Sequence, residues 1–274
     1  MSGRPHRMLE KLGNLFQIRQ PLPGLLGLGL ALVFTGLVLM AWWGITRGPV
    51  EERVVSSVIL PSPQEIAESL PDLINRRQLF DNIQVSLVRV IKGWGMALLL
   101  VIPLGLLMGA FGPVRAFFGP LNVIAGYLPL ITIIPLTFAW FQGESQKLAF
   151  LTMACFFFML PLVIAAIDDI EEIFLNTAQT LGARRHDLLL KVLFPMALPE
   201  IYNAARLAFG VGWTWIIVAE SLLADAGIGF IFMSSYRFEK PHMYWTALII
   251  LLIGFAADQL LGWLGRRLFP YRYL

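Results

Sequence analysis

Residues 176–199 read NTAQTLGARRHDLLLKVLFPMALP, a polar and basic segment between two strongly apolar parts of the chain. Ahead of it, Leu148–Ile167 contains no charged residue, and beyond it the chain becomes apolar again from Leu207. Gly182 and Pro195 punctuate the segment, which predicts a compact helical loop rather than an extended linker. A membrane protein that keeps such a loop between two spans is expected to present it to a soluble partner.

The composition places the chain among membrane proteins. Of its 274 residues, 57% are hydrophobic and only 14% are charged, whereas a soluble domain carries about 25% charged residues. A crossing takes roughly 17–25 apolar residues. Four uncharged runs are long enough: Gln20–Thr46, Gly93–Val114, Ala116–Gly143 and Leu148–Ile167. Two further runs each hold one acid, Leu207–Ala224 with Glu220 and Pro241–Leu264 with Asp258. The sequence predicts an all-α membrane protein with six transmembrane helices.

Basic residues near the span ends indicate the orientation. The N-terminal tail holds Arg4, Arg7, Lys11 and Arg19 against Glu10, and the C-terminal tail holds Arg266, Arg267 and Arg272 without an acid. Because Lys and Arg accumulate on the cytoplasmic side, both termini are predicted to be cytoplasmic. The loop at 168–206 then lies in the cytoplasm too. The first outer loop also carries arginines, but it is long and diluted by acids.

Several classes of function are disfavoured by the composition. The first apolar run exceeds the 7–15 residues of a signal-peptide core, so we expect a retained helix. One cysteine, Cys155, excludes a disulfide framework within the chain. The histidines (His6, His186 and His242) are scattered, and none shares a helical face with another ligand-type residue, so no metal site is expected. The formal charge of +3 is explained by residues that flank the spans and implies no nucleic-acid partner.

The predicted organisation has four parts. Residues 1–57 form a tail and the first transmembrane helix, with an interfacial helix in the tail through Met8–Phe16. Residues 58–92 form an outer loop, which the rigid Leu60–Pro63 opens and an amphipathic helix at Gln64–Asn75 continues. Residues 93–268 form the core, with five transmembrane helices and the loop 168–206. Residues 269–274 form a cytoplasmic tail.

Glycines and prolines mark the second and third spans. Gly105 and Gly109 permit close helix contact, which most simply means local packing, and Pro103 is expected to bend its helix. Pro129 and Pro135 would break backbone hydrogen bonds around residues 127–137. Freed backbone groups at membrane depth are tolerated only where protein or a watery cavity satisfies them. This segment is therefore the predicted pore-lining part.

The polar loop predicts a helix–turn–helix hairpin. Residues 168–181 carry a one-sided apolar stripe, and Gly182 is expected to stop that helix in left-handed geometry. Asp187 is expected to cap a second helix at Leu188–Phe194, which Pro195 and Pro199 would end. The elbow consists of Ala183, Arg184 and Arg185.

This loop resembles a motif of the permease subunits of bacterial ABC importers: Glu-Ala-Ala, three residues, Gly, nine residues, Ile-x-Leu-Pro. Here Asn176-Thr177-Ala178 precedes Gly182 at that spacing, and Val192–Pro195 follows it in the same register. The departures are Asn176, Thr177 and Phe194.

Other fragments are similar to the branch that imports nitrate, sulfonates, taurine or bicarbonate. They occur in the same order as in that branch and extend the resemblance over about residues 58–268. They are Leu60–Pro63, Ser86–Arg89, Pro103–Gly105, Ala219-Glu220 and Gly227–Gly229.

The resemblance implies a type I ABC importer permease fold in the bacterial inner membrane. It also implies a second permease copy, most simply in a homodimer, a cytoplasmic ATP-binding subunit and a periplasmic solute-binding protein. The hairpin at 171–195 would be the coupling helix. Its expected ATPase contacts are Asn176, Thr177, Ala178, Leu181, Gly182, Ala183, Arg184, Arg185 and Pro195. The chain lacks a phosphate-binding Gly-x-x-x-x-Gly-Lys-[Ser/Thr] loop. We therefore expect no enzyme activity and no cofactor in this chain, with ATP and Mg bound by the partner.

An anion path is expected to use neutral donors. The candidates are Asn122, Thr132, Thr137, Gln142, Trp213 and Thr214, although lipid-facing or interfacial packing is favoured for Trp213 and Trp215. Acids inside a membrane are functional candidates by default, so Glu220 joins the pathway set. Glu220 has an alternative in pairing with Arg237 or Lys240. Asp258 either touches solute or pairs with Arg206 or Arg266.

Three other classes remain as alternatives. A secondary transporter driven by an ion gradient would need buried coupling-ion residues and internal repeats, and both signals are weak here. A membrane enzyme needs converging nucleophiles, acids or metal ligands, and none converge in the sequence. A simple channel does not require the hairpin.

Overall fold

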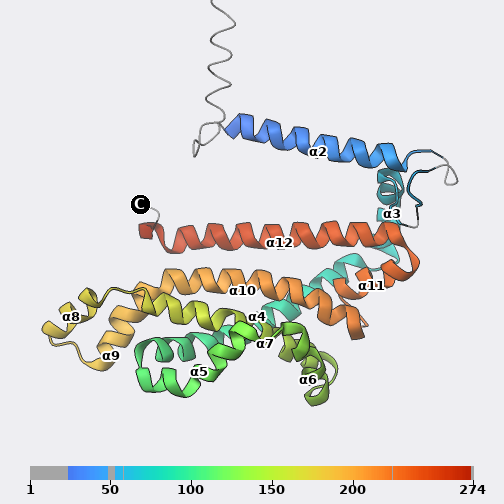
Figure 1. The fold of residues 1–274 in the computed structure, drawn as a ribbon. Coiled ribbons are helices and arrows are strands. Elements are labelled where there is room, and N and C mark those ends of the chain that lie inside the picture. The colour runs from blue at the N-terminus through green and yellow to red at the C-terminus, as the bar shows by residue number, and fades with distance from the viewer. Residues whose placement is uncertain (1–23, 49–52, 58, 224, 273–274) are drawn as a thin grey trace, which may run out of the picture. The chain divides into compact units, whose positions relative to one another are not determined.

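A computed structural model of the protein describes residues 24–48, 53–57, 59–223 and 225–272, and the secondary structure of these residues is helical (Figure 1). The chain divides into two compact units, residues 1–67 and 68–274, and each is treated by itself. The interfacial helix predicted at Met8–Phe16 lies outside the described residues, as do the basic residues of that tail.

The first unit contains α2 (Gly24–Thr46), an uncharged helix long enough to cross a membrane. This confirms the first predicted span. Trp42 Nε1 donates a hydrogen bond of 3.0 Å to the Pro61 carbonyl in the loop that follows. The helix α3 (Pro63–Asn75) then begins at the position expected for the amphipathic helix.

A reciprocal capping box starts α3. The Ser62 amide donates to Glu65 Oε2 at 2.8 Å, and the Glu65 amide donates to Ser62 Oγ at 3.2 Å. Each side chain thereby satisfies an amide that the first helical turn leaves free. Burial raises the pKa of the Glu65 carboxyl, but hydrogen bonds from Ser62 and Arg53 outweigh it and leave the pKa below its usual value.

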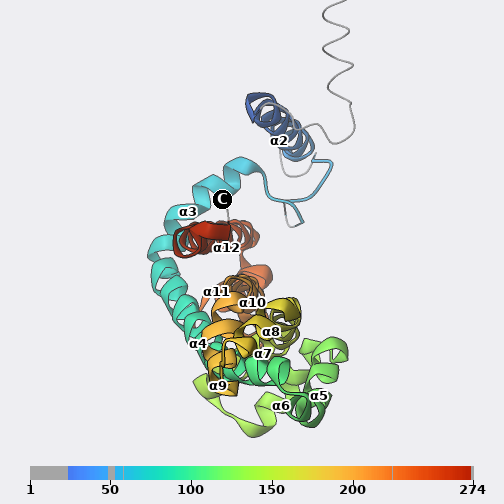
Figure 2. The same cartoon turned by 90° about the vertical axis from the view of Figure 1, so that its left-hand side faces the viewer.

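The second unit is a helical bundle. In it α7 (Gly143–Asp168) packs against both α4 (Leu79–Ala110) and α10 (Phe194–Leu223) (Figure 2). The short α11 (Ile228–Phe238) follows α10, and α12 (Lys240–Leu268) packs on both. By length and hydropathy, five helices of the described residues are able to span a membrane, and a bent pair brings the number to six. Six spans were expected.

The bent pair replaces the predicted third span. The helix α5 (Gly112–Tyr127) ends before Pro129, and a turn at Leu130–Thr132 leads into α6 (Ile133–Trp140). The two arms meet at 106°. The break expected around residues 127–137 is thus confirmed at Pro129, whereas Pro135 lies inside α6 and does not interrupt it. Pro103, in contrast, lies within α4, which continues through it to Ala110.

Small residues set the distance between α4 and α7. A Cβ added to Gly93, Gly105 or Gly109 would lie 2.6 Å from the side chain of Leu151, Val163 or Ile167, respectively. Real Cβ atoms do not approach that closely, so only glycine permits this packing. The glycine pair at 105 and 109 therefore serves local helix packing, as the sequence favoured.

Candidate coupling hairpin and transport pathway

The first arm of the hairpin is α8 (Glu172–Thr180), and it ends where the sequence predicted. The Ala183 amide donates to the Ala178 carbonyl at 3.0 Å, and the Gly182 amide donates to Gln179 at 2.9 Å. These two bonds form a Schellman motif, which requires a left-handed residue after the helix. Gly182 takes that position, with φ of +87°.

The second arm begins three residues earlier than predicted. Its first segment is α9 (Arg185–Asp187), with Arg184 at the N-cap position. Asp187 is therefore not the N-cap. It lies in the first turn, where its Oδ2 accepts from the Arg184 amide at 3.3 Å and its Oδ1 pairs with Lys191 at 2.6 Å.

The prediction that Pro195 and Pro199 end this helix is wrong. Residues Leu188–Leu193 form a π-helix that runs directly into α10, and both prolines lie inside α10. In a π-helix the bonds reach back five residues, as the Phe194 amide does to Leu189. The wider turn makes room for the Pro195 ring, which would otherwise clash with the carbonyl four residues earlier. One continuous helix therefore runs from the elbow to Leu223.

The expected coupling residues lie on the surface of this hairpin, which projects from the bundle in Figure 1. Seven are exposed (Asn176, Thr177, Leu181, Gly182, Arg184, Arg185 and Pro195), and Ala178 and Ala183 are partly buried. Leu181 at the elbow is 83% exposed, and Ile173, Phe174 and Leu190 are exposed as well. An apolar patch rimmed by basic residues suits a protein contact. The sequence did not single out Leu190.

A buried polar network lies at the other end of α10, which we call the far end of the bundle. Glu220 has a side-chain exposure of 0%. Its carboxylate accepts hydrogen bonds from Ser86 Oγ at 2.8 and 2.9 Å, from Arg89 Nη1 at 2.7 Å and from the Gly229 amide at 2.9 Å. The partners predicted for Glu220, Arg237 and Lys240, are wrong. The sequence missed Arg89 because it lies 131 residues away.

Arg89 joins this network to α7. Its Nε and Nη2 donate to the two oxygens of Glu144 at 2.7 and 2.5 Å, and its Nη1 also reaches the Ala226 carbonyl at 2.7 Å. Ser86 Oγ in turn accepts the Ile228 amide at 2.8 Å. The network therefore ties together α4, α7, α10 and the start of α11.

Backbone geometry at Gly227 completes the far end. Its φ of 118° and ψ of 166° lie in a region that only glycine occupies readily. An added Cβ would overlap the Glu220 carboxyl group. The fragments Ser86–Arg89, Ala219-Glu220 and Gly227–Gly229, which the sequence set apart, thus meet in one network.

Four of the predicted pathway residues remain accessible. Thr132 and Gln142 flank α6 and are exposed, as is Thr214 on α10, while Asn122 on α5 is partly buried. The Asn122 Oδ1 atom has no hydrogen-bond partner among the described residues. A role for these four residues in the pathway remains a prediction.

The other three predicted pathway residues are buried and hydrogen-bonded. Thr137 accepts from Gln146 Nε2 at 3.1 Å, Trp213 Nε1 donates to the Ile250 carbonyl at 3.0 Å, and Glu220 belongs to the far-end network. In this conformation they do not face a solute. Lipid-facing packing is also wrong for Trp213, which is 4% exposed.

Asp258 pairs with Arg206, one of the two partners offered by the sequence. Arg206 Nε donates to Asp258 Oδ1 at 2.7 Å and its Nη2 to Oδ2 at 2.6 Å, a bidentate arrangement. Both carboxylate oxygens of Asp258 are therefore engaged in an ion pair between α10 and α12.

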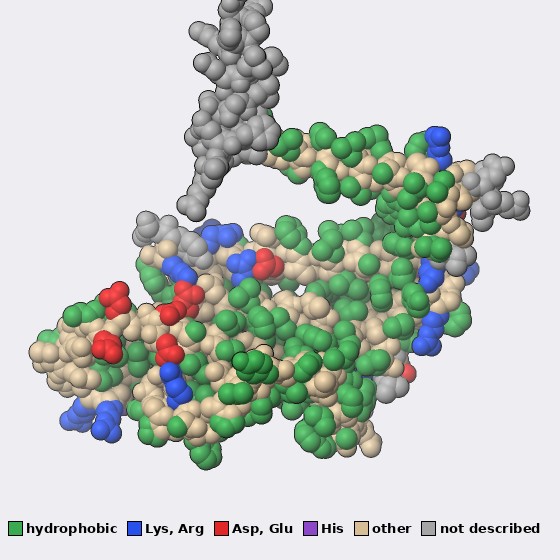
Figure 3. All heavy atoms as spheres, in the orientation of Figure 1, with side chains coloured by type: hydrophobic (Ala, Val, Ile, Leu, Met, Phe, Trp, Pro, Cys, Tyr) green, Lys and Arg blue, Asp and Glu red, His purple; other side chains and the backbone are tan. Residues whose placement is uncertain are grey.

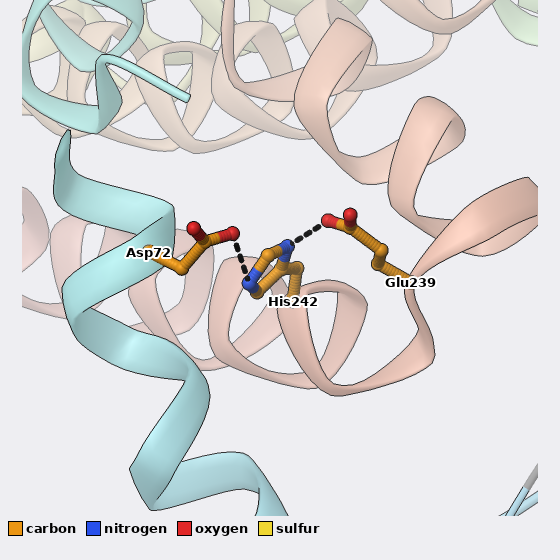
Figure 4. Close-up of side chains that lie close together, drawn as sticks. All are labelled: Asp72, Glu239 and His242. Atoms are coloured by element: carbon orange, nitrogen blue, oxygen red, sulfur yellow. Dashed lines mark ion pairs between the residues drawn. The ribbon is translucent and has the colours of Figure 1, made fainter. Parts of the chain in front are cut away.

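His242 lies between two carboxylates (Figure 4). Its Nδ1 is 2.5 Å from Glu239 Oε2, and its Nε2 is 3.5 Å from Asp72 Oδ2. The expectation that no histidine shares a helical face with another ligand-type residue was wrong, because Glu239, the N-cap residue of α12, lies one turn before His242. The carboxylates face opposite edges of the ring, and Arg76 and Arg77 pair with them. This favours an ion-pair cluster over a metal site. Burial raises the pKa of Glu239, but the bond from Arg77 and nearby positive charge lower it overall.

The comparisons with known proteins fit this geometry. Residues 101–270 match the model of a family described as binding-protein-dependent transport system inner membrane component. The chain belongs to this family. It is a multi-pass permease of the inner membrane that operates with an ATPase and a solute-binding protein. ATP hydrolysis resides in the partner subunit.

Among the relatives of this permease is the taurine transport system permease TauC of Escherichia coli (strain K12), 30% identical over 86% of each chain. The aliphatic sulfonates permease SsuC of Bacillus subtilis (strain 168), described as putative, is 27% identical over 86% of this chain and 85% of its own. The nitrate import permease NrtB of Leptolyngbya laminosa is 29% identical over 70% of each. The MetNI methionine ABC transporter in an inward-facing conformation has the same fold. It matches with a TM-score of 0.61 and 18% identity, over 69% of this chain and 95% of the matched chain.

Proposed function

We propose that this permease forms the translocation pathway for a small anion, such as nitrate, a sulfonate, taurine or bicarbonate. Two copies of the chain form the path, and the termini and the hairpin face the cytoplasm. The hairpin at 171–195 is the contact through which the ATPase moves the helices. ATP-driven closure of the ATPase displaces the hairpin and rocks the spans between inward- and outward-facing states.

The observation that carries the proposal is the construction of the hairpin. Arg184 and Arg185 of its elbow are exposed, yet two Schellman bonds fix the backbone just before them, at Gly182 and Ala183. A single helix then continues from Arg185 to Leu223. A rigid elbow on a continuous helix transmits displacement better than a flexible loop. The substrate class rests on the relatives TauC, SsuC and NrtB, each named for an anionic or zwitterionic solute.

The test replaces Gly182 and Ala183, which form the turn between the two arms of the hairpin. Proline has no amide to donate to Gln179 and cannot adopt the φ of +87° at Gly182. We expect Gly182→Pro and Ala183→Asp to insert in the membrane normally but to abolish substrate-stimulated ATP turnover. The assay uses the complete importer in proteoliposomes. The matched control is Gly48→Pro, because Gly48 also has positive φ and no neighbour within 4 Å of an added Cβ.

Two results would count against the proposal. Elbow variants that still show substrate-stimulated ATP turnover would remove the coupling role. Uptake by the permease alone, driven by an ion gradient, would instead support a secondary transporter.

A further inference from the structure

A cavity of about 400 Å³ opens at the far end of the bundle, between α11 and the last turn of α10. Its polar lining consists of two arginines and two serines: Arg77, Arg237, Ser221 and Ser234. The remaining lining residues are apolar and include Phe230 and Met233. None of the residues predicted to form the pathway lines this cavity.

The cavity carries net positive charge, since none of its lining residues is acidic. Arg77 shares its charge with Glu239 at 3.2 Å. Within the described part of the chain, Arg237 is exposed and makes no ion pair. Figure 3 shows basic side chains gathered at this end of α12, where it meets α11. The Arg237 guanidinium lines the cavity without pairing with a carboxylate of the described residues, so it is available to bind an anion.

The hydrogen-bonding groups suit an ion with several oxygens. Each arginine presents a planar fork of N–H donors that matches nitrate or sulfonate oxygens. Ser221 Oγ donates to the Ile217 carbonyl at 2.6 Å, and Ser234 Oγ donates to the Ile231 carbonyl at 3.0 Å. A hydroxyl rotates freely, so either hydrogen is able to turn from its helix carbonyl to a bound oxyanion. The apolar wall suits a short alkyl group.

We propose that this cavity is a binding subsite for a small oxyanion, with room for the short alkyl chain of an organic sulfonate. The proposal rests on the proposed anion import and adds Arg77 and Arg237 as the residues that hold the ion. Glu239 Oε2 pairs with both Arg77 and His242, so the subsite and the ion-pair cluster share one carboxylate.

Charged thiol reagents test the site without measuring transport. Ser234→Cys places a thiol in the cavity, and the native Cys155 is buried, so the introduced thiol is the accessible one in this chain. Modification of the peptide that contains position 234 is followed by mass spectrometry in the complete importer, in a phosphate-free maltoside detergent. Anionic sulfonatoethyl and cationic trimethylammonioethyl methanethiosulfonates are compared.

We expect the anionic reagent to react about tenfold faster than the cationic reagent, because the local potential concentrates anions. Ethanesulfonate should slow both reactions, whereas sodium chloride at the same ionic strength should not. Arg237→Gln should remove the reagent preference and the protection, and Arg77→Gln should weaken both. Arg76→Gln is the matched control, since Arg76 carries the same charge next to Arg77 but does not line the cavity. It should change neither.

Three outcomes overturn the subsite. The first is equal reactivity of the two reagents, and the second is an Arg76→Gln effect as large as that of Arg237→Gln. The third is protection by phosphatidylglycerol in nanodiscs but not by ethanesulfonate, which would assign the cavity to a lipid headgroup. ATP-dependent anion uptake by the unmodified importer separates the two proposals. If uptake occurs while the introduced thiol shows no preference for the anionic reagent, only the subsite falls, and if no anion is taken up, the proposed function falls.

Discussion

The hairpin and the far-end network stand at opposite ends of α10 and are built in opposite ways. The hairpin is exposed, and its shape comes from bonds between residues at most five apart, such as Ala183 to Ala178. The centre of the network, Arg89 and Glu220, is buried and joins residues 131 apart. The hairpin is proposed to meet a partner, and its local bonds hold the backbone in shape without help from the bundle. The network joins the ends of several helices, because its hydrogen-bonding groups come from more than one helix.

The largest effect is expected at the network. Arg89→Met leaves Glu220 buried without its cation, and breaking one side of a buried ion pair costs about 3–5 kcal/mol. We expect a strongly lowered melting temperature of the purified permease. The double variant Arg89→Met/Glu220→Gln should recover part of the loss, because it removes the uncompensated charge.

The matched control is Arg115→Met. Arg115 pairs with Asp168, and both side chains are more than 40% exposed, so its loss should cost at most about 1 kcal/mol. If Arg89→Met lowers the melting temperature no more than Arg115→Met does, the network does not stabilise the far end of the bundle.

The same substitution at two glycines sharpens the comparison. Alanine costs about 1–2 kcal/mol in the left-handed backbone of Gly182 and about 1–3 kcal/mol in the region that Gly227 occupies. Gly182 has open space around it, whereas an added Cβ at Gly227 overlaps the Glu220 carboxyl group. Gly227→Ala should therefore lower the melting temperature well beyond Gly182→Ala. If the two variants lower the melting temperature equally, the Glu220 carboxyl group moves away from the added methyl group at little cost in stability.

A change at the elbow should affect binding and not folding. Leu181→Ser removes an apolar side chain that is 83% exposed. We expect the dissociation constant for the ATPase to rise about tenfold, the equivalent of 1.4 kcal/mol. The melting temperature of the permease should stay unchanged. Affinity measured on purified subunits checks this. Leu251→Ser, an exposed site in the middle of α12, is the control and should bind the ATPase normally.

The smallest effect is expected within the second arm of the hairpin. Lys191→Ala breaks the ion pair with Asp187, which contributes little because the lysine side chain is 76% exposed to solvent. Neither the melting temperature nor ATP turnover should change measurably. A clear loss of coupled ATP turnover would assign Lys191 a contact with the ATPase.

The sequence predicted what local chemistry determines. Gly182 stops α8 because left-handed backbone favours glycine, and Pro129 breaks the third span because proline lacks an amide. The apolar runs, four uncharged and two with one acid each, also predicted the number of candidate spans, although α4 begins at Leu79 and not at Gly93.

The parts that failed depend on contacts distant in sequence or on how a helix absorbs strain. Glu220 was predicted to pair with Arg237 or Lys240, because nothing in the neighbouring sequence reveals a partner 131 residues earlier. Pro195 was expected to end a helix, but a π-helix ahead of it accommodates the ring. Motif fragments such as Ser86–Arg89 were noticed only as a resemblance, although together they describe one buried network.

The central claim is that the hairpin meets the ATPase, and a photocrosslink tests it directly. Benzoylphenylalanine at Leu181, in the complete importer, should give a covalent adduct with the ATP-binding subunit on illumination. The same group at Leu251 should give none. An importer that assembles and hydrolyses ATP, yet shows no adduct from Leu181, would contradict the account.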